Sequence, residues 1–72
     1  MAFRDFASFT SSSIQALRYD EETLVLQVIF NNGGMYEYYD VSARVAEEFD
    51  RSESKGGFLA ANVKGHYRYS RV

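Results

Sequence analysis

The chain contains no cysteine, no proline, no tryptophan and only one histidine, His66. Without cysteine it has neither disulfide bonds nor thiolate ligands for a metal, so an apolar core or a partner must hold the fold together. No apolar run approaches the roughly 20 residues needed to cross a bilayer. Arg4 and Asp5 interrupt the N-terminal segment where a signal peptide would be apolar. The sequence therefore predicts a cytoplasmic protein with no membrane partner.

A chain of 72 residues forms one domain, and we expect it to span residues 1–72 without a linker. A domain of this size buries only about 60% of the surface that its unfolded chain exposes, so its stability is marginal. Six phenylalanines and six tyrosines compensate, because each aromatic side chain buries a large area. The aromatic residues are therefore expected to supply much of the core.

The formal net charge of -2 conceals an asymmetry between the two parts of the chain. Residues 1–50 carry a net charge of -6, whereas residues 51–72 carry +4. Such a split is compatible with an anion-binding face, and also with two halves that pack together and neutralise each other. The sequence leaves both interpretations open.

Three segments are predicted to be strands, after an irregular N-terminal arm at residues 1–10. They cover residues 14–19, 24–30 and 35–39, and polar turns separate them. In the second strand the even-numbered residues from Leu24 to Phe30 form one apolar face. Val25 and Ile29 make the opposite face apolar as well, around Gln27. We therefore expect the N-terminal phenylalanines or a second subunit to cover that second face.

The turn at Asn32-Gly33 is a strong hairpin signal that allows two registers. A two-residue loop would place Glu37 beside Val28, whereas a three-residue loop over residues 32–34 would pair Val28 with Tyr38 and turn Glu37 outward. We favour the longer loop because it keeps a carboxylate out of the core. The pair Tyr36 and Tyr38 then lies either at the edge of the core or on a platform on which planar ligands stack.

Two short helices are predicted to follow the strands. Val41, Val45 and Phe49 recur every four residues, which predicts a helix over residues 42–51, and Ser54 is positioned to cap a second helix over residues 55–64. The predicted fold class is α+β, with a three-stranded antiparallel meander and two helices packed on one face; a short strand is an option for the C-terminal segment. The predicted core consists of Leu26, Val28, Phe30, Val45, Phe49, Leu59 and Val63.

The sequence shows no catalytic or cofactor motif. His66 has no cysteine and no sequence-adjacent acid to make it a base or a metal ligand. The segment Ser54-Lys55-Gly56-Gly57 lacks the order of a phosphate-binding loop. The sequence therefore predicts a non-enzymatic protein with no cofactor and no metal site.

A set of short motifs resembles the KTSC domain over residues 11–72. Their order and spacing carry the resemblance: Ser11-Ser12-Ser13-Ile14, Tyr19-Asp20, Leu26-x-Val28-x-Phe30, Gly33-Gly34-x-Tyr36-x-Tyr38, Val41, Ser54-x-Gly56, Phe58-Leu59, Val63, Gly65 and Tyr67-x-Tyr69. This family occurs alone in bacterial proteins and at the C-terminus of some lysyl-tRNA synthetases. The resemblance implies a bacterial or phage origin and a role in RNA binding. Ala60 departs from the family, which commonly has asparagine there.

Tyrosines and basic residues in the second half of the chain are the candidate RNA-binding residues. Stacking on exposed rings and neutralisation of phosphates are the interactions that single-stranded RNA binders use. The candidates are Tyr36, Tyr38, Lys55, Lys64, His66, Tyr67, Arg68, Tyr69 and Arg71. The isoelectric point near 5.2 argues against this role, because dedicated nucleic-acid domains usually lie above about 9.

The alternative is a protein-interaction or self-assembly module. An apolar face left exposed on so small a domain commonly marks a contact surface. The candidate interface of a homodimer, or of a contact with another protein, is either the face that bears Val25 and Ile29 or the N-terminal phenylalanines Phe3 and Phe6. Charging that face should then abolish the association.

Overall fold

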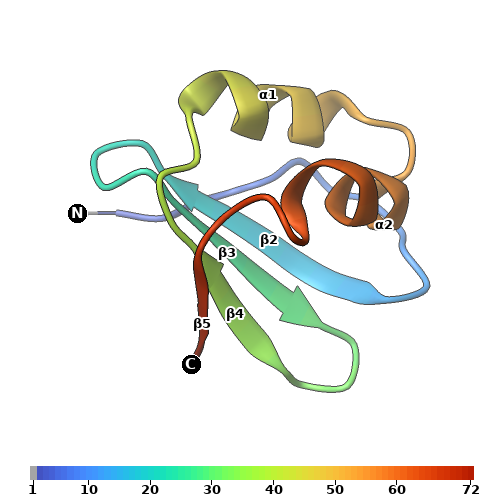
Figure 1. Ribbon diagram of the computed structural model, residues 1–72. Coiled ribbons are helices and arrows are strands. Elements are labelled where there is room, and N and C mark those ends of the chain that lie inside the picture. Colours follow the sequence, from blue (N-terminus) through green and yellow to red (C-terminus); the bar gives the residue numbers. More distant parts are fainter. Residues whose placement is uncertain (1) are drawn as a thin grey trace.

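The computed structural model describes residues 2–72, which form one antiparallel sheet with a helical layer on one face (Figure 1). The strands pair in chain order and are β1 (Arg4–Asp5), β2 (Ile14–Asp20), β3 (Val25–Phe30), β4 (Met35–Tyr38) and β5 (Tyr69–Arg71). The helices are α1 (Ala43–Arg51), α2 (Lys55–Phe58) and η1 (Leu59–Val63). The α+β class is confirmed, and the predicted meander forms the centre of the sheet. No helix within the described residues is long and apolar enough to cross a membrane.

The sheet has one more strand at each edge than the predicted meander. Residues Arg4 and Asp5 lie in the segment predicted to be an irregular arm, yet they pair with Tyr19 and Arg18 as β1. At the other edge the C-terminal segment forms β5, which pairs with β4. The C-terminal strand was an option in the prediction and is confirmed, whereas β1 was not predicted, because it pairs with a segment that is distant in sequence.

The β3–β4 hairpin has a three-residue loop, but its register differs from the favoured one by two residues. The Phe30 N–H donates to the Gly34 carbonyl at 2.8 Å, and the Gly33 N–H donates back to the Phe30 carbonyl at 2.9 Å. The loop is therefore residues 31–33, and Gly33 rather than Gly34 takes the positive φ, at 91°. Val28 consequently pairs with Tyr36 instead of Tyr38. A shift of two residues leaves each side chain on the same face of the sheet. The prediction that Glu37 points away from the core is therefore confirmed.

Both helices begin at serine caps, of which Ser54 was predicted from the sequence. The Ser42 hydroxyl accepts from the Val45 N–H at 3.3 Å, and the Ser54 hydroxyl accepts from the Gly57 N–H at 3.1 Å. Such bonds satisfy backbone donors that have no partner inside the helix. The second helix begins as α2 and continues without a break into η1, a π-helical turn ending at Val63. Gly65, at φ 79°, then turns the chain toward β5.

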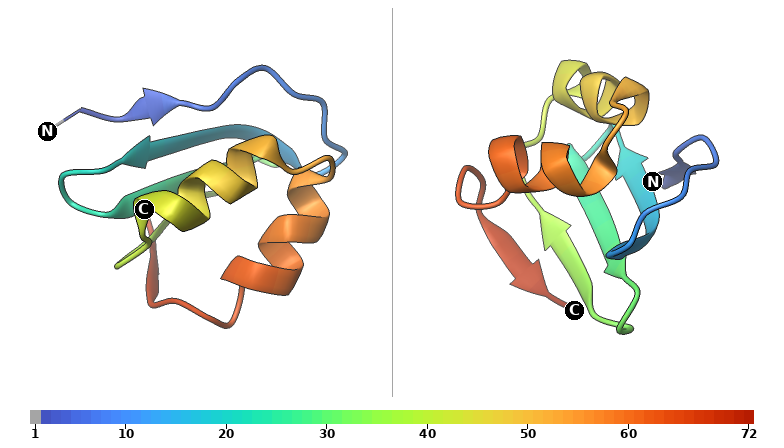
Figure 2. Two further views of the ribbon diagram at one scale, coloured as in Figure 1. Left: turned by 90° about the horizontal axis from the view of Figure 1, so that it is seen from above. Right: turned by 90° about the vertical axis from the view of Figure 1, so that its right-hand side faces the viewer.

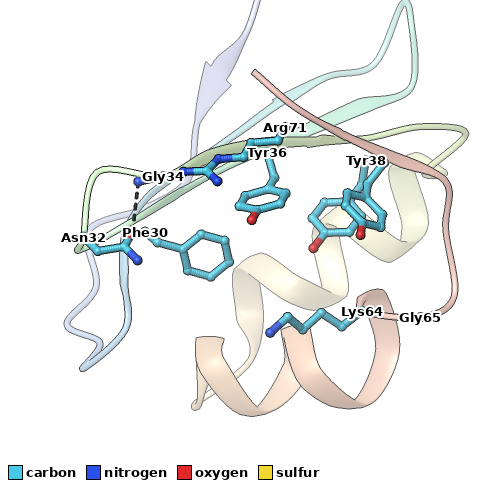
Figure 3. A pocket seen from close by; sticks show the side chains of 9 residues that line it. Phe30, Asn32, Gly34, Tyr36, Tyr38, Lys64, Gly65 and Arg71 are labelled. Atoms are coloured by element: carbon cyan, nitrogen blue, oxygen red, sulfur yellow. Dashed lines mark hydrogen bonds between the residues drawn. The ribbon is translucent and has the colours of Figure 1, made fainter.

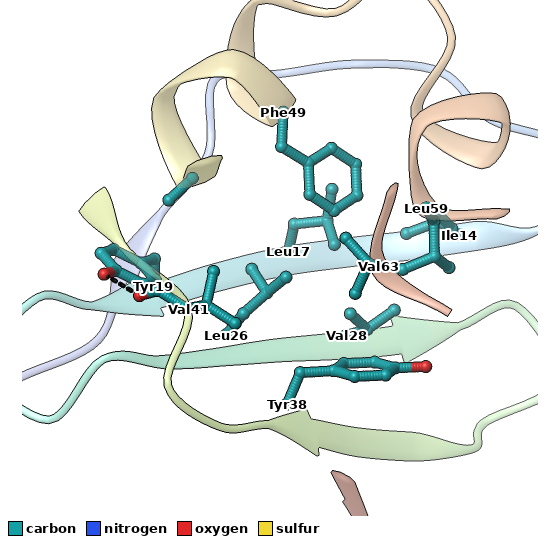
Figure 4. Packing of buried hydrophobic residues seen from close by; sticks show 11 residues of the cluster. Ile14, Leu17, Tyr19, Leu26, Val28, Tyr38, Val41, Phe49, Leu59 and Val63 are labelled. Atoms are coloured by element: carbon teal, nitrogen blue, oxygen red, sulfur yellow. Dashed lines mark hydrogen bonds between the residues drawn. The ribbon is translucent and has the colours of Figure 1, made fainter. Parts of the chain in front are cut away.

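The core lies between the helices and the sheet (Figure 4). Five of the predicted core residues are buried, namely Leu26, Val28, Phe49, Leu59 and Val63, while Phe30 and Val45 pack against them half-buried. The buried cluster also includes residues that the prediction omitted: Ile14, Leu17, Tyr19, Tyr38, Val41 and Ala46. Half of the omitted residues come from β2. The others lie in β4, before α1 and in α1, where burial depends on how the helices pack on the sheet.

The second face of the sheet has no helix over it (Figure 2). A row of side chains crosses this open face, in which Gln27 accepts from Arg18 Nη1 at 3.4 Å and donates to Glu37 Oε2 at 3.3 Å. Gln27 is only 8% exposed, because its neighbours in the row cover it. Of the N-terminal phenylalanines expected to cover this face, Phe6 and Phe9 pack against the core on the helical side instead, where the Phe6 ring lies 5.4 Å from that of Phe49.

Candidate aromatic binding site

A hollow of about 760 Å³ lies on the helical side of β4 and β5, next to the end of η1 (Figure 3). Three distant parts of the chain form it: the β3–β4 hairpin, the C-terminal end of the second helix, and β5. We call it the aromatic hollow, and its lining residues are Phe30, Asn32, Gly34, Tyr36, Tyr38, Lys64, Gly65, Tyr69 and Arg71. Its volume falls within the range of pockets that hold small organic ligands, about 300–1,000 Å³.

The register between β4 and β5 gathers the aromatic rings. Tyr38 pairs with Tyr69 and Tyr36 pairs with Arg71, so all four side chains leave the sheet on the same face. The Tyr69 ring lies 5.8 Å from the Tyr36 ring and 5.7 Å from the Tyr38 ring, and Tyr36 meets Phe30 edge to face at 5.5 Å. The rings therefore form one continuous aromatic surface.

The rings of the aromatic hollow differ in exposure, which decides what each one can do. Tyr69 is 60% exposed and offers its ring to a ligand, whereas Tyr38 is buried. Burial raises the pKa of the Tyr38 hydroxyl above its ordinary value of 10.0, and the neighbouring Tyr36 and Tyr69 hydroxyls add to the shift. The Tyr38 hydroxyl is therefore protonated at neutral pH and is able to donate a hydrogen bond.

Two cations and no carboxylate line the aromatic hollow. Figure 3 shows the Lys64 ammonium and the hydroxyls of Tyr36 and Tyr38 pointing toward the same space from opposite walls. Within residues 2–72, neither Lys64 nor Arg71 forms a salt bridge, so their charges are not neutralised locally. An anion entering the hollow would meet two uncompensated positive charges beside a set of aromatic rings.

The structure brings together five of the nine predicted RNA-binding residues, and these are Tyr36, Tyr38, Lys64, Tyr69 and Arg71. Arg68 lies outside the hollow, where it donates to Asp40 at 3.0 Å and sits 5.7 Å from the Tyr39 ring. Tyr67 packs half-buried against the core, and His66 is exposed on the turn after η1. The aromatic and basic residues of the tail therefore do not share one site. Tyr69 and Arg71 line the hollow, whereas His66, Tyr67 and Arg68 lie outside it.

Lys55 is not available to a phosphate, contrary to its prediction as a candidate contact. Its side chain is 7% exposed, and its ammonium donates to the carbonyls of Asp50, at 3.1 Å, and Ser52. These carbonyls belong to the last turn of α1 and the residue after it, whose acceptors lack partners inside the helix. Lys55 also lies over the Phe9 ring at 5.7 Å. Its charge therefore holds the end of α1 in place.

The structure separates Phe6 from the other candidate interface residues. Val25 and Ile29 lie on the open face of the sheet, on either side of Gln27, and both are half-buried. Phe6 packs against Phe49 on the helical side, and Phe3 is half-buried before β1. Phe6 cannot share an interface with Val25 and Ile29 without leaving the core.

Four lining residues of the aromatic hollow were not predicted from the sequence: Phe30, Asn32, Gly34 and Gly65. Phe30 was assigned to the core, and Asn32 and Gly34 to the hairpin loop. The signal that could have identified Phe30 and Asn32 is the hairpin register, because it sets which turn residues lie beside Tyr36. Nothing local indicates Gly65, which reaches the hollow only because η1 ends over β5. Within residues 2–72 no group of three or more metal-ligating side chains is present.

Comparison with known proteins supports the family resemblance over most of the chain. The sequence profile of the KTSC domain matches residues 10–67. A lysine–tRNA ligase from a Nostoc species is 38% identical over 61 residues, which span 85% of this chain but 11% of the ligase. An uncharacterised protein from Stutzerimonas stutzeri is 36% identical over 63 residues and is covered over 89% of its length. The crystal structure of a KTSC domain protein from Yersinia pestis superposes with a TM-score of 0.90 at 28% identity, covering 99% of each chain. The chain belongs to the KTSC domain family.

Proposed function

We propose that this domain is a non-catalytic module that binds single-stranded RNA in the aromatic hollow. The observation that carries the proposal is the combination of an exposed tyrosine ring with Lys64 and Arg71 in a hollow lined by no carboxylate. Proteins that bind single strands use these two components together, since bases stack on aromatic rings and phosphates contact Lys and Arg.

The most exposed ring, Tyr69, is the stacking residue of this proposal, and Lys64 and Arg71 contact the backbone. The two cations belong to different elements on either side of the rings, so a strand lying across Tyr69 would place phosphates near both. The protonated hydroxyl of Tyr38 is a donor for a base edge or a 2′-hydroxyl. The exposed ring of Tyr69 suits an unpaired RNA segment. A duplex keeps its base faces stacked inside the helix, so it offers no base face to Tyr69.

The acidic isoelectric point does not oppose this proposal at the level of the site. The carboxylates are concentrated in residues 1–50, whereas Lys64, Tyr69 and Arg71 belong to the part with a net charge of +4. Arg68 is already paired with Asp40 and contributes less to the local field. A phosphate responds chiefly to charges within about 10 Å at 0.1 M salt, so the lining of the hollow outweighs the total charge.

The ligase relatives favour RNA as the ligand class. Their name describes ligation of lysine to tRNA, and the matching segment corresponds to 11% of their length. The proposal assigns an accessory contact with RNA to this segment and leaves the chemistry to the remainder of the ligase. When the domain occurs alone, it would bind unpaired segments of RNA through the same residues.

Titration of a labelled single-stranded RNA octamer, followed by fluorescence anisotropy at several salt concentrations, tests the proposal. Tyr69→Ala should weaken binding by about 1–3 kcal/mol with little change in the salt slope. Lys64→Gln and Arg71→Gln should each flatten the slope by about 0.7, because each removes one phosphate contact. Arg51→Gln is the matched control, since it removes an exposed positive charge from α1, away from the hollow.

Two outcomes would contradict the proposal. The first is an absence of binding at tens of micromolar protein in low salt. The second is binding that Tyr69→Ala leaves unchanged while Arg51→Gln and Lys64→Gln flatten the salt slope equally, because this result would indicate general electrostatic attraction with no role for the aromatic hollow. A double-stranded RNA of the same sequence should bind more weakly than the single strand.

A further inference from the structure

The β5 strand forms an edge of the sheet with unpaired backbone groups. The Val72 N–H donates to the Met35 carbonyl at 2.9 Å, and the Arg68 carbonyl accepts from the Tyr39 N–H at 2.9 Å. Hydrogen bonds alternate along an antiparallel pair, so the backbone groups of Tyr69 and Arg71 point away from β4. Within residues 2–72 no further strand pairs with β5. An unpaired edge of this kind is a template for another strand.

Exposed apolar side chains are concentrated at this same edge. Within residues 2–72 three large apolar side chains are exposed: Tyr69 is 60% and Val72 59% exposed, whereas the third, Leu24, lies in the turn before β3. The opposite edge differs, because β1 consists only of Arg4 and Asp5, and short charged edges resist pairing. The β1 edge is therefore protected against pairing with another chain, whereas the β5 edge is available for it.

We propose that the domain dimerises by antiparallel pairing of β5 with β5 of a second copy, about a twofold axis at Ser70. In this arrangement Tyr69 lies opposite the partner's Arg71, and Arg71 opposite the partner's Tyr69. Each of these two pairs uses backbone groups that already point outward, so both exchange a complete set of hydrogen bonds. Ser70 then lies directly opposite the partner's Ser70.

The sequence of β5 is complementary to itself in this register. The twofold axis brings the Arg71 guanidinium beside an aromatic ring of the partner, which is a favourable contact for a cation. The small Ser70 occupies the position where opposing side chains approach most closely in an antiparallel pair. This self-complementarity is the reason for choosing a second copy over an unrelated peptide, whose side chains would need to match Tyr69 and Arg71 by chance.

Dimerisation through β5 would place the two aromatic hollows next to each other. Tyr69 and Arg71 line the hollow, and an axis perpendicular to a continuous sheet keeps both hollows on the same side. The pairing rests on the backbone and sequence of β5 and does not depend on what the hollow binds. Its test is accordingly made without RNA.

Sedimentation velocity over a concentration series tests the dimer, with Ser70→Lys as the decisive variant. In the monomer a lysine at this position would face Glu37, its cross-strand neighbour, and should leave the fold intact. In the dimer two lysines would lie directly opposite each other, and like charges in this position are destabilising. Ser70→Lys should therefore weaken self-association by about fivefold. Ser70→Thr, which keeps a small neutral side chain, should associate as the wild type does.

Ile29→Lys distinguishes a dimer formed through β5 from one formed through the open face of the sheet. It charges the face that bears Val25 and Ile29, so it should leave a β5-mediated dimer unchanged. A wild-type protein that is monomeric at millimolar concentration would overturn the proposal, and so would a dimer that Ile29→Lys disrupts and Ser70→Lys does not. Slower hydrogen exchange of the Tyr69 and Arg71 amides at high protein concentration would support it, because these N–H groups have no partner in the monomer.

Discussion

Lys55 and Lys64 belong to the same helical segment yet have opposite roles. Lys55 lies at its first turn, where the preceding loop folds back and presents the carbonyls of Asp50 and Ser52 to the ammonium. Lys64 follows the last turn and extends into the aromatic hollow. A buried ammonium is costly unless its donors are satisfied, so the backbone acceptors around Lys55 determine its structural role.

Replacing each lysine by methionine should separate the two roles. Lys55→Met removes charged hydrogen bonds and leaves carbonyls at the end of α1 without a partner, so it should lower the free energy of unfolding by about 2 kcal/mol. Lys64→Met changes an exposed side chain and should alter stability by no more than about 0.5 kcal/mol. Urea denaturation followed by circular dichroism measures both. Equal losses in the two variants would contradict the structural role of Lys55.

At the scale of elements, the β3–β4 hairpin positions Tyr36 and Tyr38. Its loop places Gly33 at φ 91°, a conformation that side chains other than glycine adopt at a cost. Asn32 supports the turn, because its side-chain oxygen accepts from the Gly34 N–H at 2.9 Å. Because Gly33 takes the left-handed conformation, the loop covers residues 31–33. The position of the loop sets the register, and the register sets which residue of β3 pairs with each tyrosine.

Gly33→Ala should destabilise the protein through backbone strain alone. A Cβ at this position would meet no atom within 4 Å, so steric overlap with neighbouring segments is absent. The left-handed conformation itself should cost about 1–2 kcal/mol in the free energy of unfolding. Gly33→Asn should lose less, because asparagine tolerates this region better. Thermal or urea unfolding of the two variants compares them, and an asparagine variant less stable than the alanine variant would show that the loop adopts another conformation.

At the scale of the whole molecule, one layer of helices on one face of the sheet leaves two buried tyrosines at the boundary between the layers. Tyr19 donates its hydroxyl hydrogen bond to the Val41 carbonyl, and Tyr38 packs under the helical layer. Burial raises the pKa of both hydroxyls above 10.0, and nearby Glu21 and Asp20 add to the shift at Tyr19, which Arg4 partly opposes. Ionising either tyrosine requires a charge in the interior.

These raised pKa values predict a loss of stability at alkaline pH. Below pH 10 the tyrosines are protonated in both the folded and the unfolded state and contribute no pH dependence. Above pH 10 the unfolded chain releases its protons first, so the folded state binds more protons and the free energy of unfolding falls as pH rises. Tyr38→Phe should reduce this fall relative to the wild type, as measured by urea unfolding between pH 8 and about 11. Identical pH profiles for the two proteins would contradict the prediction.

Local patterns in the sequence were sufficient to predict the central strands, both helices and the Ser54 cap of the second helix. Alternation over Val25–Phe30 and the four-residue spacing of Val45 and Phe49 depend only on the geometry of each element, which acts over a few residues. Five of the residues that line the aromatic hollow were among the candidates for RNA binding, because the family resemblance directed attention to tyrosines and basic side chains, which the sequence shows without a structure.

Only the tertiary structure decided which of the candidates share a site. Pairing of Tyr38 with Tyr69 and the end of η1 over β5 bring together residues from three segments, and no local preference specifies such contacts. The same is true of Lys55, whose acceptors become known only when the loop after α1 folds back. The sequence thus determines the elements through short-range backbone geometry, whereas the site depends on long-range packing, in which the burial of each side chain is set by distant parts of the chain.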